Sequence, residues 1–224
     1  MWQAGGMHIG ILGGTGPAGS ALGARLASVG YEVTIGSRSA DRARDVCLEL
    51  TEKYPELAAL LRGGDNAAAA ACDVIVIATP WDSAATTVQE NAESLAGKIL
   101  ISMANALVRV AGEFQPLLPP RGSVAAHIQA AAPLCKVVAA FHHLPAKELG
   151  HLGSPIDSDV LICSDDPASL RLVAEIVDRI PGCRPLDAGQ LSNATAIEAF
   201  TAVLLQLNVR YKTRVAPKLT GIRE

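Results

Sequence analysis

The sequence is poor in charged and aromatic side chains and has no long hydrophobic run. Charged residues make up 18% and aromatic residues 4% of the 224 residues, and the net charge is −3. This balance gives no general attraction to nucleic acid or to an anionic membrane, and no stretch reaches the roughly 18 consecutive apolar residues of a transmembrane helix. The N-terminus has neither the basic region nor the apolar core of a signal peptide. We therefore expect a cytoplasmic protein with no nucleic-acid or membrane partner, and we expect residues 1–6 to form a loose extension.

Cysteine is also sparse, and its distribution argues against disulfides and metal centres. The five cysteines are odd in number and isolated from one another: Cys47, Cys72, Cys135, Cys163 and Cys183. Most of them lie within apolar segments, where a free thiol behaves as a small core residue. We expect no metal site.

The first feature that points to a function is a glycine-rich turn near the N-terminus. A short apolar strand ends at Leu12, and Gly14, Gly16 and Gly19 follow with the spacing G-x-G-x-x-G. Such glycines allow a tight turn, a close approach of backbone to a pyrophosphate, and packing of a helix on a strand. A proline at the start of the helix leaves the helical N–H groups free to face a diphosphate. The predicted dinucleotide-binding loop is Gly14, Thr15, Gly16, Pro17 and Ala18.

The end of the second predicted strand indicates which dinucleotide is bound. An NAD site carries a carboxylate there, but Glu32–Gly36 is followed by Ser37 and Arg38, and Arg42 lies four residues further on. A hydroxyl and two guanidinium groups suit the extra phosphate of NADP. Glu32 opens the strand and is expected at the opposite edge of the sheet. The alternative is that these arginines, with Arg44, form only a solvated helix face.

The order of predicted elements gives the fold class. Continuous apolar runs over 73–78, 99–102 and 137–141 alternate with helical segments over 39–53, 82–95 and 124–132, with a short helical piece before Gly63-Gly64 and a loop at the prolines 116–120. This alternation is typical of an α/β protein with a Rossmann-type, doubly wound and mainly parallel sheet. We divide the chain into a dinucleotide-binding domain, 7–146, and a small C-terminal α/β lobe, 147–224, that closes the cofactor cleft. Within the lobe we expect strands over 159–163 and 184–187 and helices over 166–179 and 191–211.

Ligands of doubly wound sheets lie across the carboxyl ends of the strands, so the segments that follow these strands should meet at the site. They contain Thr79, Pro80 and Trp81 after the apolar run 73–78, and Asn105 after the run 99–102. After the run 137–141 they contain His142, Pro145 and Ala146. We expect them to border the nicotinamide and a second ligand.

The whole chain resembles the NADPH-dependent reductases of the deazaflavin coenzyme F420, the F420H2:NADP+ oxidoreductase family. The motifs that carry the resemblance are Gly13-Gly14-Thr15-Gly16, Gly36-Ser37-Arg38, Thr79-Pro80-Trp81, His142-His143-Leu144-Pro145-Ala146, and Arg184-Pro185-Leu186-Asp187-Ala188-Gly189 with Leu191-Ser192-Asn193. The chain departs from the family pattern at Asn105-Ala106, where relatives often carry a proline.

The resemblance implies hydride transfer between NADP(H) and F420, with both cofactors bound as small-molecule ligands. It implies that Thr15, Ser37, Arg38 and Arg42 hold the NADP phosphate. It also implies that Pro80, Trp81, His142, Pro145 and Ala146 border the nicotinamide and the deazaflavin. Because both cofactors carry the hydride chemistry themselves, the protein supplies mainly orientation, and His142 would orient the deazaflavin.

Two other functions stay open from the residues alone. A reductase of a small imine, ketone or hydroxy acid would use the same NADP half, although such enzymes generally build the substrate site from a larger helical domain. A non-enzymatic NADPH sensor would keep the phosphate clamp without a second cleft.

The C-terminal region suggests two further properties. Apolar residues surround most of the final helix, which predicts a homodimer with this helix near the interface. The basic residues that follow are expected to steer an acidic coenzyme: Arg210, Lys212, Arg214, Lys218 and Arg223.

Overall fold

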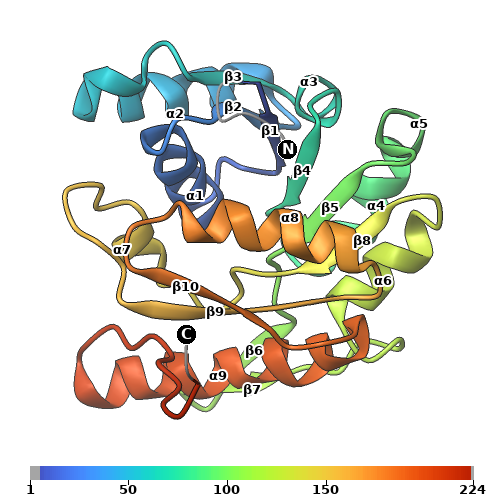
Figure 1. The fold of residues 1–224 in the computed structure, drawn as a ribbon, viewed down its shortest axis with the longest axis vertical. Helices are drawn as coiled ribbons and strands as arrows, with labels where there is room; N and C mark the ends of the chain where they lie inside the picture. Colours follow the sequence, from blue (N-terminus) through green and yellow to red (C-terminus); the bar gives the residue numbers. More distant parts are fainter. Residues whose placement is uncertain (1–5, 223–224) are drawn as a thin grey trace.

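The computed structural model describes residues 6–222, and it is built around one large sheet (Figure 1). The strands are β1 (His8–Leu12), β2 (Glu32–Ser37), β3 (Leu61–Asp65), β4 (Val74–Ile77), β5 (Ile99–Ser102), β6 (Leu107–Val110), β7 (Glu113–Pro116), β8 (Lys136–Ala139), β9 (Ser158–Ser164) and β10 (Cys183–Asp187). The helices are α1 (Pro17–Ser28), α2 (Ala40–Lys53), η1 (Pro55–Leu57), α3 (Asn66–Ala70), α4 (Ala84–Glu90), α5 (Ala92–Leu95), α6 (Val124–Ala131), α7 (Ala146–Leu149), α8 (Pro167–Asp178), η2 (Leu191–Asn193) and α9 (Ala194–Tyr211). Residues 1–5 of the predicted N-terminal extension lie outside the described residues.

The predicted fold class is confirmed. The sheet has eight strands in the order β10-β9-β8-β5-β4-β1-β2-β3, and all neighbouring pairs are parallel except β8 and β9. Buried side chains pack on both faces of it. Helices α1, α2 and α8 contribute to the core on one face, and α3, α4, α6 and α9 contribute to the core on the other. Such two-sided burial explains why the central strands read as continuous apolar runs.

One predicted helical piece is helical only at its start and continues as an edge strand. The segment before Gly63-Gly64 forms η1 and then β3, which pairs with β2 in parallel. Its glycines hide the strand pattern in the sequence, and packing requires one of them. A Cβ on Gly63 would lie 2.4 Å from the backbone of Ala43 in α2, so a glycine is needed where this helix crosses the strand.

Two other differences concern local structure. The predicted helix over 82–95 is split into α4 and α5 at Asn91, whose side-chain Nδ2 donates to the carbonyl oxygen of Thr87 at 2.8 Å. The segment before the predicted proline loop forms the antiparallel hairpin β6–β7, whose turn residues Ala111 and Gly112 both have positive φ. This hairpin lies beside α9 (Figure 1), and the amide of Phe114 donates to Gln206 Oε1 at 3.2 Å.

The predicted C-terminal lobe continues the same sheet. Strand β9 pairs antiparallel with β8, and β10 pairs parallel with β9. Asp159 on β9 is fully buried and receives two hydrogen bonds from Arg184 on β10, at 2.8 and 2.7 Å. The predicted closing of this part over the cleft stays a prediction.

A buried arginine also joins the two predicted domains. Arg25 on α1 is 1% exposed, and its guanidinium donates to carbonyl oxygens at the end of α7 and in the turn that follows it. The distances are 2.9 Å to Glu148, 3.0 Å to Leu149, 2.7 Å to His151 and 3.1 Å to Ser154. Burial lowers the pKa of Arg25 from its usual value, because no carboxylate compensates fully for the loss of water.

Candidate functional site

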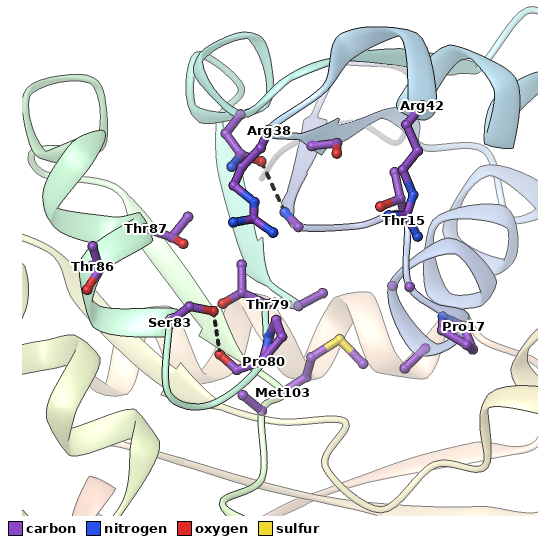
Figure 2. A pocket seen from close by; sticks show the side chains of 18 of the residues that line it. Thr15, Pro17, Arg38, Arg42, Thr79, Pro80, Ser83, Thr86, Thr87 and Met103 are labelled. Atoms are coloured by element: carbon purple, nitrogen blue, oxygen red, sulfur yellow. Dashed lines mark hydrogen bonds between the residues drawn. The ribbon is translucent and has the colours of Figure 1, made fainter.

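A cleft of about 540 Å³ opens where β1, β2 and β4 end (Figure 2). Strand β1 has β2 on one side and β4 on the other, so the direction in which the chain winds reverses here. This is the point at which doubly wound sheets bind ligands. The cleft is lined by Gly13, Thr15, Gly16, Pro17, Ala18, Gly19, Ser37, Arg38, Arg42, Asn66, Ala78, Thr79, Pro80, Ser83, Thr86, Thr87, Glu90, Met103 and Ala104.

The glycine turn forms one wall of the cleft, and the glycine that makes the tight turn is not the one that was expected. The positive φ of the tight turn, +67°, belongs to Gly13 rather than to Gly14. A Cβ on Gly16 would meet no atom within 4 Å, so the space above this residue is open. Gly19 allows the close packing that was expected, because a Cβ there would lie 2.8 Å from the Cα of Gly14.

The start of α1 completes this wall as an anion-binding surface. Gly16 is the N-cap of the helix, and no side chain satisfies its first amides. Pro17 follows at the first helical position. Free amides together with the helix dipole favour a negatively charged group in the open space above Gly16.

Two arginines reach the cleft, Arg38 from the turn between β2 and α2 and Arg42 from the first turn of α2. Figure 2 shows Arg38 extending toward the centre of the cleft and Arg42 lying close to Thr15. Within residues 6–222 neither guanidinium takes part in an ion pair, whereas Arg44 is paired with Asp41. Glu32, the acid of β2, lies at the other end of the strand and faces Arg62 at 3.9 Å. The strand end therefore presents unneutralised positive charge.

Several cleft residues had no signal in the sequence, although Met103 and Ala104 lie in the segment after the strand over 99–102, which was expected to face the cofactor. Asn66, the first residue of α3, accepts a hydrogen bond from the amide of Gly13 at 3.1 Å and so steadies the tight turn. Its position depends on β3, which was not predicted. The opposite wall contains polar residues of the α4 region, Ser83, Thr86, Thr87 and Glu90, and Met103 and Ala104 after β5. A helix N-cap and a helix face explain these residues equally well from sequence alone.

Other predicted residues lie outside the lining of this cleft. Trp81 follows Pro80 and is 36% exposed. Pro145 and Ala146 are the N-cap and first residue of α7. Asn105 donates through Nδ2 to the carbonyl oxygen of His142 at 3.0 Å. The roles of these residues toward a second ligand stay predictions.

His142 is buried behind the cleft wall and is 4% exposed. Burial, with a smaller contribution from His143, lowers the pKa of its imidazole to about 3. The ring lies within reach of the backbone of Met103 and Ala104, which weakly favour the proton. No described group meets the geometry of a hydrogen bond to either ring nitrogen. The side chain is therefore uncharged near neutral pH and can act by position and hydrogen bonding, not as a cationic acid.

Residues 6–222 contain neither a candidate metal-binding cluster nor a candidate membrane span. No group of three or more histidine, cysteine, aspartate or glutamate side chains among them is arranged to hold a metal ion. All five cysteines are free and buried. In this part of the chain, no helix is both long and apolar enough to cross a membrane.

Most of the described basic residues near the C-terminus form ion pairs with acidic residues. Arg210 pairs with Glu113 at 3.2 Å, Arg214 with Glu148 at 2.7 Å, and Lys218 with Asp157 at 2.8 Å. Arg223 lies outside the described residues. These pairs reduce the local excess of positive charge on which the predicted steering depends.

Comparisons with known proteins find relatives over nearly the whole chain. Residues 8–106, which include the glycine turn and both arginines, match the family model described as NADP oxidoreductase coenzyme F420-dependent. The chain is 36% identical over 222 residues to a protein from Methanocaldococcus jannaschii and 34% identical over 226 residues to one from Methanothermobacter marburgensis, with 97% of each chain covered. Both relatives are named F420-dependent NADP reductase. A crystal structure from Arthrobacter sp. FB24, proposed to be an F420-dependent NADP reductase, is 28% identical with a TM-score of 0.79 and covers 95% of this chain and 100% of its own.

Proposed function

The chain belongs to the family of F420-dependent NADP reductases, and from this premise we propose how its residues hold NADP(H) and present it to F420. The protein is an oxidoreductase that transfers a hydride between these two molecules. Membership of the family favours this activity over the reduction of a small imine, ketone or hydroxy acid and over a purely sensing role.

The proposal for NADP depends above all on the two cleft arginines that lack a carboxylate partner. Arg38 and Arg42 would bind the phosphate on the adenosine ribose, with Ser37 and Thr15 adding hydroxyl groups. The open space above Gly16 and the free amides of α1 would take the pyrophosphate. The residues present therefore fit the dinucleotide in both shape and charge.

The nicotinamide end would lie toward Thr79, Pro80, Met103 and Ala104. Thr79 supports this placement because its Oγ1 is buried with no hydrogen-bond partner among the described residues. Buried polar atoms are normally hydrogen-bonded, so this hydroxyl is available to a ligand. The apolar side chains of Pro80 and Met103 would exclude water from one face of the ring.

In this mechanism the bound nicotinamide supplies or accepts the hydride, and F420 is the other substrate. The residues of the chain contribute orientation, because hydride transfer needs the reacting atoms about 3–3.5 Å apart and aligned. Trp81, His142, Pro145 and Ala146 would border the deazaflavin. Since His142 is uncharged near neutral pH, the proton consumed when F420 is reduced would come from water and not from this ring.

The test is spectroscopic. Purified protein is mixed with oxidised F420 and either NADPH or NADH, and the loss of the deazaflavin absorbance is followed. We expect rapid loss with NADPH and a kcat/KM at least about tenfold lower with NADH, since a charge-assisted hydrogen bond to the phosphate contributes about 1.5–3 kcal/mol. No loss with either nucleotide would contradict the proposed function.

We further propose that the protein is a cytoplasmic homodimer. The five buried free thiols suit a reducing compartment. The outer side of α9 carries exposed apolar residues, with Val203 52% and Phe200 39% exposed. A second copy that packs against this helix would bury them.

A further inference from the structure

The turn that follows β8 has an unusual backbone. Phe141 has a φ of +66°, and its side chain is 1% exposed. L-residues with bulky side chains rarely adopt this left-handed conformation. The other two non-glycine residues with positive φ among residues 6–222, Ala111 and Lys212, are exposed at a hairpin turn and at a helix end. Phe141 is therefore held in place by its surroundings in a way that the other two are not.

Side chains from two distant elements hold this turn through one carbonyl group. The carbonyl oxygen of His142 accepts from Asn105 Nδ2 at 3.0 Å and from Thr201 Oγ1 at 3.4 Å. Asn105 follows β5, and Thr201 lies on the buried side of α9. The next residue is held as well, because the His143 ring nitrogen Nε2 forms a hydrogen bond with the carbonyl oxygen of Asp159 at 2.8 Å.

The side chain positioned by this turn, the His142 ring, has two buried nitrogen atoms without a hydrogen-bond partner among the described residues, and Asn105 Oδ1 shares that property. The ring lies next to the backbone of Met103 and Ala104, which line the cleft. Buried polar groups of native proteins are normally satisfied by protein, water or ligand, and through Met103 and Ala104 the orientation of this ring bears directly on the cleft wall.

We propose that Asn105 and Thr201 are positioning residues that act through the His142 carbonyl group. They hold the strained turn at Phe141 so that the His142 imidazole keeps one orientation toward the deazaflavin. This inference rests on the proposed function, because it takes the second substrate to lie on the Met103 and His142 side of the cleft. An uncharged ring has one donor and one acceptor nitrogen, so its orientation decides which of them faces the substrate.

The consequence is a link between α9 and the reaction site. Thr201 is on the same helix whose outer side carries Phe200 and Val203, the residues expected at a dimer interface. A shift of α9 would change the Thr201 hydrogen bond and hence the orientation of His142.

The first variant for the test is Thr201→Val, which keeps the shape of the side chain and removes the donor. Thr201→Ser restores the hydroxyl group, and Thr213→Val makes the same replacement at an exposed position whose side chain has no role in the proposal. Two measurements apply to each protein: the KM values for F420 and NADPH, and the nitrogen resonances of the His142 ring in the 15N-labelled protein.

We expect Thr201→Val to raise the KM for F420 about fivefold, the effect of one lost hydrogen bond, and to leave the KM for NADPH within about twofold. The His142 ring resonances should shift in Thr201→Val, return in Thr201→Ser and stay unchanged in Thr213→Val. Unchanged resonances together with an unchanged KM for F420 would overturn the proposal. An equal rise of both KM values would also overturn it, because a general loss of structure affects both substrates.

Two further outcomes are covered. Should Thr201→Val fail to fold, Asn105→Asp keeps the size of the other side chain, removes its donor and is read by the same measurements. If the wild-type protein does not reduce F420, the proposed function fails, and the ring resonances still decide whether Thr201 positions His142.

Discussion

Arg38 and Arg42 owe their importance to the residues that are absent around them. The turn after β2 has no carboxylate at the position where an NAD site requires one, and Glu32 is at the far end of the strand beside Arg62. Arg44, two residues beyond Arg42 on the same helix, is instead paired with Asp41. The position of a residue relative to the strand end therefore separates the two proposed phosphate-binding arginines from an ordinary surface arginine.

The first prediction concerns a single residue and the substitution Arg38→Ala. Loss of charge-assisted hydrogen bonds to a phosphate, each worth about 1.5–3 kcal/mol, should raise the Kd for NADPH by roughly one to two orders of magnitude. The Kd for NADH should change little, because NADH lacks that phosphate. Calorimetric titration of both nucleotides measures the difference, with Arg44→Ala as the matched control. An equal rise of the Kd for both nucleotides would show that Arg38 does not bind the phosphate of NADPH.

Sequence reasoning reached these arginines but missed Asn66, for a physical reason. Asn66 contacts the glycine turn only because β3 brings the start of α3 beside it. The signal for β3 is hidden by Gly63 and Gly64, and the packing of α2 requires the glycine at position 63. The role of Asn66 therefore depends on a strand that the sequence does not reveal, and no local sequence pattern marks this residue.

At the scale of elements, strand order could be anticipated only in part. The apolar runs identified the central strands, and the glycine turn placed β1 and β2 together. The antiparallel pairing of β9 with β8 and the hairpin β6–β7 depend on long-range contacts that a single sequence does not display. The hairpin did have a weak signal, since Val108 and Val110 alternate with Arg109 before Ala111-Gly112.

Arg25 supports the second prediction. Its guanidinium satisfies carbonyl groups at the end of α7 and in the turn after it, and so fixes this segment to α1, the helix proposed to face the pyrophosphate. Arg25→Met should lower the free energy of unfolding by about 3 kcal/mol or more, because several buried acceptors lose their donor at once. Urea unfolding measures the change, and Arg171→Met, on the exposed side of α8, is the control. A loss below about 1 kcal/mol would show that water replaces the guanidinium without cost.

At the scale of the whole molecule, the apolar surface of α9 is continued by its neighbour. Val110 on β6 is 46% exposed, and the hairpin is fixed to α9 by the bond between Phe114 and Gln206. The ion pair of Arg210 with Glu113 lies between the end of α9 and the same hairpin. An apolar centre with a charged rim is typical of a protein–protein interface.

The third prediction follows from this surface. Light scattering at micromolar concentration should give a mass twice that of one chain. Val203→Glu should produce monomers, because it places a charge in the apolar centre of the interface. Leu48→Glu, on α2, is the control at a comparably exposed apolar residue (60% against 52%). A wild-type monomer would refute the dimer and would leave the exposed side of α9 without an explanation.

The central claim is that one cleft aligns a nicotinamide with a deazaflavin for direct hydride transfer. It is tested most directly by NADPH that carries deuterium at one of the two hydrogens of nicotinamide C4, with the reduced F420 then analysed by mass spectrometry. A site that fixes one face of the nicotinamide predicts one deuterium per reduced F420 from one labelled form and none from the other. Equal labelling from both forms, or a product that takes this hydrogen from solvent, would contradict the account.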